Sequence, residues 1–163
     1  MKRIYSVLVE NRSGVLSRIA GLFSRRGFNI ESLAVGVTES DDLSRMTIVT
    51  DDEGSEPQRI FEQIRKQLSK MIDTVRVKAL SPTECILREL VLIKLKGDIN
   101  SAALLCIKHG ARIAEYSEDT VTIEITAEPE KVRSIFKAFD EFEIIETVRT
   151  GVISLQKGSS SIK

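Results

Sequence analysis

The chain has 163 residues, a hydrophobic fraction of 42% and a formal net charge of zero, from 24 basic and 24 acidic side chains. This length allows one domain or two small ones, and the hydrophobic fraction is ordinary for a globular protein. A zero net charge argues against a nucleic-acid partner, which usually requires a basic surface. No apolar run reaches the roughly 18 residues of a membrane span, and none suits a signal peptide. We therefore expect neither nucleic acid nor membrane as a partner.

Cysteine and histidine are too sparse to suggest a catalytic or metal centre. Cys85 and Cys106 are isolated thiols, which form neither a disulfide framework nor a Cys-x-x-Cys pair and favour a reducing, cytoplasmic location. His109, the only histidine, lies where a helix is expected to end, and there it would complement the helix dipole. No nucleophile or acid–base pair stands out. We predict no catalytic residue, no metal site and no cofactor in this chain.

The first half of the sequence alternates between strand and helix periodicities. Gly14 precedes an apolar stripe at helical spacing, and Gly27 can end that helix in a left-handed conformation. Alternating and β-branched segments indicate strands. The expected elements are a strand over 4–9, a helix over 15–26, strands over 30–38 and 43–49, a helix over 57–71 and a strand over 73–79.

The second half repeats this order. Gly14 and Gly27 are 13 residues apart, and so are Gly97 and Gly110. The run Ile72-Asp73-Thr74-Val75-Arg76 is echoed by Ile145-Glu146-Thr147-Val148-Arg149. We therefore predict an α+β fold of two tandem ferredoxin-like βαββαβ domains. The expected division is a first domain over 1–79, a linker over 80–85, and a second domain over 86–163 with a flexible tail. Domains this small favour dimerisation through sheet edges or helix faces.

The residues around the first predicted helix are suited to bind a free amino acid. Gly14 has no Cβ, so a carboxylate can approach the N–H groups at the helix start, where the dipole favours negative charge. The amides of Asn11 and Asn29 can donate and accept hydrogen bonds. Apolar neighbours could line a pocket for the ligand's side chain. The candidate effector-binding residues are Asn11, Gly14, Val15, Leu16, Asn29 and Ile30.

The same loop is also typical of an ordinary helix cap, so both interpretations stay open. The second half offers an internal comparison. Lys94 and Arg112 stand 83 residues after the two asparagines, so neither amide is repeated. Asp98, at the entrance of the corresponding helix, would occupy the N–H groups with its own carboxylate. If either half binds an amino acid, we expect it to be the first.

Several stretches together resemble a known family. They are Ser6–Asn11, Gly14–Arg18, Gly21–Phe23, Arg26–Leu33, Leu43–Ile48 and Asp73–Val77. They resemble the ACT domain, a small-molecule sensor of amino-acid metabolism, and more closely the regulatory small subunit of acetohydroxyacid synthase, also called acetolactate synthase. The resemblance is dense over residues 2–78 and returns at 88–94 and 148–158.

The resemblance implies a subunit without catalytic chemistry that binds a large catalytic subunit. That large subunit uses thiamine diphosphate, Mg²⁺ and usually FAD to join two 2-oxo acids on the way to valine, leucine and isoleucine. The small subunit raises this activity and confers feedback inhibition by a branched-chain amino acid, commonly valine. The resemblance places the effector on the six residues named above, at the interface of a homodimer of ACT domains.

Functions of other classes fit the residues less well. An RNA-binding module would stack bases on aromatic side chains, and the predicted strand 43–49 has none. A copper chaperone would need cysteines in the loop over 11–14, and a stand-alone enzyme would need a convergent catalytic set. The alternative that stays open is an ACT-domain sensor that regulates a different biosynthetic enzyme.

Overall fold

A computed structural model describes residues 2–51 and 57–162. The chain divides into two compact units. The first unit contains residues 1–86 together with 152–163, and the second contains residues 87–151. In the described residues, no helix is long and apolar enough to cross a membrane.

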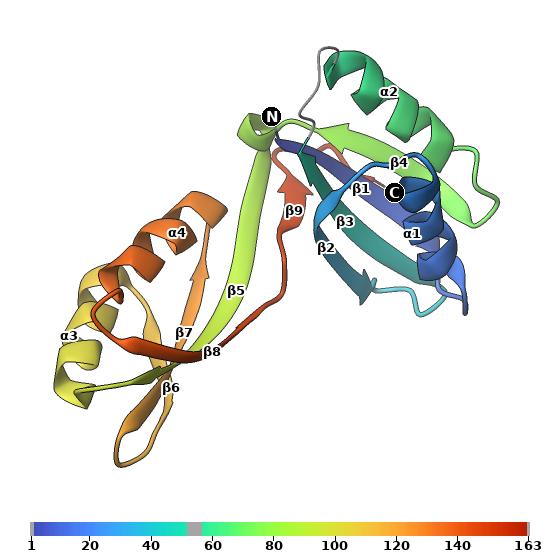
Figure 1. The fold of residues 1–163 in the computed structure, drawn as a ribbon. Helices are drawn as coiled ribbons and strands as arrows, with labels where there is room; N and C mark the ends of the chain where they lie inside the picture. Colours follow the sequence, from blue (N-terminus) through green and yellow to red (C-terminus); the bar gives the residue numbers. More distant parts are fainter. Residues whose placement is uncertain (1, 52–56, 163) are drawn as a thin grey trace. The chain divides into compact units, whose positions relative to one another are not determined.

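The first unit is a four-stranded antiparallel sheet covered by two helices on one face (Figure 1). Its elements are β1 (Lys2–Glu10), α1 (Val15–Arg25), β2 (Ile30–Val37), β3 (Leu43–Asp51), α2 (Pro57–Leu68) and β4 (Thr74–Leu80). The strand order is β2-β3-β1-β4, so β2 and β4 form the two edges. The core lies between the sheet and the helices, where Tyr5, Val7 and Val9 of β1 meet Ile19 and Phe23 of α1.

The second unit repeats this topology. Its elements are β5 (Cys85–Lys96), which begins in the first unit, α3 (Ile99–His109), β6 (Arg112–Tyr116), β7 (Thr120–Ala127), α4 (Pro129–Ala138) and β8 (Glu143–Arg149). The order β6-β7-β5-β8 corresponds strand for strand to that of the first sheet. Val91, Ile93 and Leu95 alternate into the core of this unit. The predicted fold of two βαββαβ units is confirmed.

The predicted linker is shorter than expected. The expected range, 80–85, contains the last residue of β4 and the first residue of β5, with the 3-10 turn η1 (Pro82–Glu84) between them. A proline in the first turn suits such a short helix, because it fixes φ and needs no hydrogen-bond acceptor. The irregular part is therefore only a few residues long.

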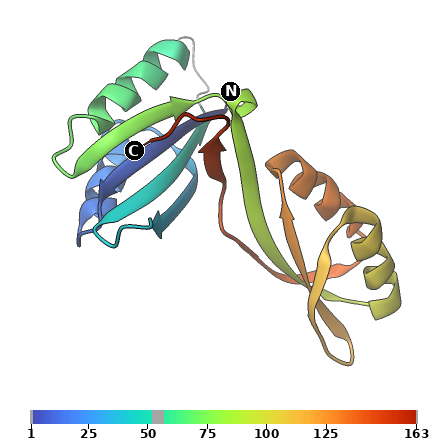
Figure 2. The ribbon, with the colours of Figure 1, turned by 180° about the vertical axis from the view of Figure 1, so that it is seen from behind.

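The end of the chain returns to the first unit, whereas its sequence predicts a flexible tail of the second domain. β9 (Ile153–Gln156) pairs with β5, whose first residues belong to the same unit. The following residues run across the sheet face that the helices leave uncovered (Figure 2). Ile162 is buried there, and Lys78 of β4 donates hydrogen bonds to Gln156 and Ser160. The end of the chain thus covers part of the second face of the first sheet.

Candidate functional site

The start of α1 has no side-chain cap. Gly14 occupies the N-cap position in a left-handed conformation, with φ of 82°, and has no side chain that could accept a hydrogen bond. The first helical bond runs from the Arg18 N–H to the Gly14 carbonyl oxygen over 3.0 Å. In the described part of the chain, the N–H groups of Leu16 and Ser17 donate to no backbone or side-chain acceptor. These two donors, at the positive end of the helix dipole, remain available to an anion.

Asn11 is held next to this helix start by the beginning of β3. Its Nδ2 donates to the Asp41 carbonyl oxygen over 2.8 Å, and its Oδ1 accepts from the Ser44 hydroxyl over 3.1 Å. Its backbone N–H donates to the Asp42 carbonyl oxygen over 2.7 Å. One amide proton and one lone pair of the side chain remain for a ligand. The sequence pattern does not indicate these partners, which lie about thirty residues further along the chain.

An ion pair fixes the position of α1. Nε of Arg18 donates to the Asp73 carboxylate over 2.7 Å, and the Asp73 carbonyl oxygen accepts the N–H of Glu10 over 2.9 Å. A Cβ at Gly14 would lie 3.0 Å from an Arg18 terminal nitrogen, besides requiring an unfavourable positive φ. Glycine therefore keeps the helix start open and leaves the ion pair undisturbed.

The apolar candidates divide between core and surface. Val15 is 2% exposed and belongs to the core, so its side chain cannot line a surface site. Leu16 is 44% exposed, beside the free N–H groups, and can contact the apolar part of a ligand. Ile30 is half-buried against the core at the beginning of β2.

The structure does not bring Asn11 and Asn29 together within one chain. Asn11 is bonded to Ser44, near the beginning of β3, whereas Asn29 immediately precedes Ile30, which pairs with Thr50 near the end of β3. Thr50 lies six positions after Ser44, which corresponds to roughly 20 Å along a strand. The side chain of Asn29 is exposed. The two amides therefore lie at opposite ends of the sheet.

The corresponding helix of the second unit is closed by its own residue. Asp98 is the N-cap of α3, and its carboxylate accepts the N–H of Ser101 over 2.7 Å. Hydrogen bonds from Ser101 lower the pKa of Asp98 below its ordinary value. Arg112, which corresponds to Asn29, pairs with Glu124 over 3.0 Å. The expectation that Asp98 occupies these N–H groups is confirmed.

Among the described residues, no group of three or more His, Cys, Asp or Glu side chains is arranged to hold a metal ion. Cys85 and Cys106 are both buried, and burial raises the pKa of each thiol. A thiol with a raised pKa is a poor nucleophile at neutral pH. The polar groups described above can bind and orient a small molecule.

Comparisons with known proteins cover both units. A family model described as an AHAS small subunit-like ACT domain matches residues 5–76, and one described as the small subunit of acetolactate synthase matches residues 88–158. A probable acetolactate synthase small subunit of Archaeoglobus fulgidus is 43% identical over 98% of this chain and 99% of its own length. The acetolactate synthase small subunit of Mycolicibacterium smegmatis is 41% identical over 96% of this chain and 92% of its own.

A solved structure agrees with these matches. The crystal structure of the acetolactate synthase small subunit from Thermotoga maritima superposes with a TM-score of 0.89 and 31% sequence identity. The match covers 98% of the present chain and 99% of the Thermotoga maritima chain.

Replacing Asp98 by alanine should lower the thermal midpoint of the second unit by a few degrees at neutral pH, because it removes the cap of α3. The pKa of Asp98 is lower in the folded state, so its contribution is present above the unfolded value, about 4. That contribution is lost as the pH falls through the folded value. Calorimetric scans of wild type and variant should therefore converge in acid.

Asp119→Ala is the matched control for this variant. Asp119 is exposed, and among the described residues its carboxylate forms only a surface pair with Lys96 over 3.6 Å, so we expect almost no change in Tm. If the Tm difference between wild type and Asp98→Ala is as large in acid as at neutral pH, the carboxylate does not act as the cap.

Proposed function

Given that this chain belongs to the family of acetolactate synthase small subunits, we propose that it activates a large catalytic subunit and makes it sensitive to a branched-chain amino acid, with valine as the expected effector. The observation that carries the effector site is the uncapped start of α1 beside the fixed amide of Asn11. We expect both subunits in the cytoplasm. Because the family matches extend over both units, they favour the large subunit of acetolactate synthase as the partner over a different biosynthetic enzyme.

The effector carboxylate would bind the N–H groups of Leu16 and Ser17. Both donors point out of the helix start, and the absent side chain of Gly14 leaves room for the ligand. The remaining donor and acceptor of Asn11 suit the carboxylate and the ammonium group. Leu16 supplies apolar surface for an aliphatic side chain. A ligand of micromolar to millimolar affinity requires only about 4 to 8 kcal/mol of binding free energy.

A second copy of the chain would supply Asn29. β2 is an edge strand whose only charged residue is Glu31, and its last residues, from Val35 to Val37, are exposed. Such an edge, which lacks lysine and proline, is suited to pair with another strand. If two copies of β2 pair antiparallel about a two-fold axis, the beginning of one strand lies beside the end of the other.

This pairing would complete the site. The end of β2 is next to Ser44, because Val37 pairs with Ser44, and Ser44 bonds to Asn11. The beginning of the partner's β2, with the partner's Asn29 directly before it, would then approach Asn11. Each dimer would hold two sites, and each site would take Asn11 from one chain and Asn29 from the other.

An effector that bridges two chains favours one arrangement of the dimer. If the large subunit binds the other arrangement more tightly, effector and partner oppose each other by thermodynamic linkage. Coupling of this kind is typically worth about 1 to 3 kcal/mol. The condensation chemistry would be supplied by thiamine diphosphate, Mg²⁺ and FAD in the large subunit. This chain would contribute the binding groups for the effector and the conformational change.

Asn29→Ala and Gly14→Asp should each weaken valine binding by at least about tenfold and abolish feedback, while activation of the large subunit persists. Asn29→Ala removes an amide from the site, and Gly14→Asp places a carboxylate against that of the ligand. The measurements are calorimetric titration with valine and the holoenzyme rate. Asn100→Ala, an exposed asparagine of α3, is the matched control. Wild-type affinity in both site variants would remove the proposed site.

Val35→Lys tests the edge that forms the dimer. Val35 on β2 is 46% exposed, and a lysine there should shift the protein to monomer and abolish valine binding, although both asparagines remain. Val75→Lys is the control on β4, the other edge of the sheet, where Val75 is 55% exposed. Sedimentation velocity gives the oligomeric state. Dissociation by Val75→Lys alone would place the interface on β4.

A further inference from the structure

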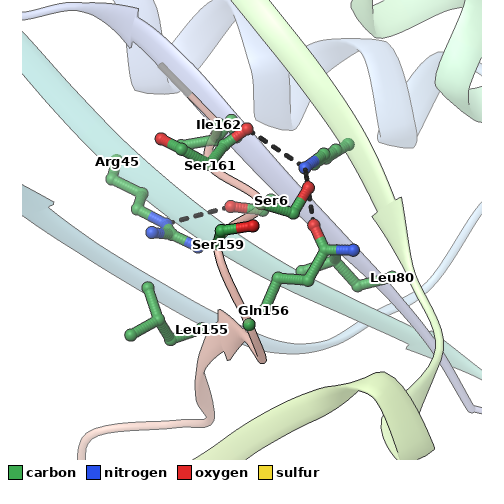
Figure 3. Close-up of a pocket in the computed structure, with 11 residues that line it drawn as sticks. Ser6, Arg45, Leu80, Leu155, Gln156, Ser159, Ser161 and Ile162 are labelled. Carbon is green, nitrogen blue, oxygen red and sulfur yellow. Dashed lines mark hydrogen bonds between the residues drawn. The ribbon is translucent and has the colours of Figure 1, made fainter.

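A second pocket lies on the face of the first sheet that the helices leave uncovered (Figure 3). Its volume is about 290 Å³. The sheet contributes Ser6, Arg45, Lys78 and Leu80, and the end of the chain contributes Leu155, Gln156 and residues 158–162. The start of α1, where the effector is proposed to bind, contributes no lining residue. This pocket is therefore separate from the effector site.

Two cations line the pocket, and within residues 2–51 and 57–162 their hydrogen-bond acceptors are neutral groups. Arg45 donates through Nε to the Ser6 hydroxyl over 3.0 Å and through a terminal nitrogen to the Ser154 carbonyl oxygen over 2.8 Å. Lys78 donates to the Gln156 side-chain oxygen over 2.5 Å, to the Ser160 hydroxyl over 2.7 Å and to the Ser161 carbonyl oxygen over 3.0 Å. These acceptors take the three protons of the Lys78 ammonium group and two of the Arg45 guanidinium protons, but they carry no compensating negative charge.

The charges of Arg45 and Lys78 are not neutralised within the described residues, where no carboxylate forms an ion pair with either side chain. Both side chains are half-buried. Burial lowers the pKa of Arg45 from its ordinary value, which reflects the cost of removing its charge from water. Charges removed from water are stabilised by a partner of opposite sign, so these two cations favour an anion in the pocket.

The remaining groups of the pocket suit an oxyanion with several oxygens. The hydroxyls of Ser6 and Ser159 are donors that can rotate towards a ligand. The second terminal nitrogen of Arg45, which bonds to none of the described residues, is a further donor. A guanidinium matches the geometry of phosphate oxygens, and a dianion would balance both cations. The volume lies at the lower end of small-molecule sites, so it also has room for a small organic group.

We propose that the pocket between the sheet and residues 155–162 binds a phosphate group, of inorganic phosphate or of a small phosphate ester, between Arg45 and Lys78. Lys78 belongs to the sheet and donates hydrogen bonds to the last residues of the chain. A ligand bound to Lys78 would therefore join these residues to the face of the sheet. Binding therefore stabilises this segment in its packed position. The effector site is not needed for this effect.

Calorimetric titration and thermal unfolding of the full chain with inorganic phosphate test the proposal, at ionic strength matched with sodium chloride. We expect saturable binding with a Kd below about 10 mM and a rise in Tm that chloride and acetate do not give. Glycerol phosphate tests the ester: tighter binding than inorganic phosphate assigns the pocket to an ester, and equal affinity assigns it to the free ion.

Two variants place the phosphate in this pocket. Arg45→Gln should weaken the binding of phosphate at least about tenfold. Ser159→Glu, at an exposed position, should do the same by adding a carboxylate, and it keeps the test valid if Arg45→Gln fails to fold. Lys94→Gln, an exposed cation of β5 outside the pocket, is the matched control and should bind as wild type. No binding to wild type, or wild-type affinity in Ser159→Glu, would overturn the proposal.

Discussion

The register of β1, β3 and β2 is the constraint on which the proposed regulation depends. β1 and β3 pair along their whole length, and β2 continues that ladder on the other side of β3. The register places the end of β1, with Asn11, beside Ser44, and the beginning of β2, with Asn29, beside Thr50. Because backbone hydrogen bonds fix this arrangement, no side-chain movement can bring the two amides to one ligand in one chain. If one effector contacts both amides, as we propose, the second amide must come from another copy of the chain.

The two units show how one topology can be open or closed to a ligand. At the start of α1, glycine leaves the helix donors open. Asn11 is held beside them by hydrogen bonds to Asp41, just before β3, and to Ser44 of β3. At the start of α3, Asp98 accepts the Ser101 N–H, so the same position stabilises its own helix. The residue type at the N-cap therefore decides whether the helix start is open or is closed by its own side chain. The difference lies in the sequence and does not require a different fold.

Much of the fold could be predicted from the sequence because its signals are local. Helical stripes, alternating strands and the glycines at 14, 27, 97 and 110 predicted both βαββαβ units, and the Asp98 cap depends on a residue three positions away. The partners of Asn11 could not be predicted, because they come from a loop distant in sequence. The position of Asn29 depended on the register, which periodicity alone does not give.

The end of the chain was predicted incorrectly for a related reason. Lys157 to Ser161 is polar and rich in serine, a composition typical of flexible tails. Its packing depends on distant groups: Lys78 on the sheet donates hydrogen bonds to it, Arg45 donates to Ser154 just before it, and Ile162 is buried at its end. Neither cation has a carboxylate partner in the described residues, which makes this face of the sheet a second region where a ligand is expected.

The central claim is that each effector site takes Asn11 from one chain and Asn29 from its partner. Mixed dimers of Asn11→Ala and Asn29→Ala chains test it most directly, with differently tagged chains to isolate the mixed species and valine calorimetry as the measurement. Neither variant alone should bind valine. One of the two sites in each mixed dimer should be intact, so random mixing restores roughly a quarter of all sites. A mixture that binds no valine would contradict the shared site, because sites built within single chains cannot complement one another.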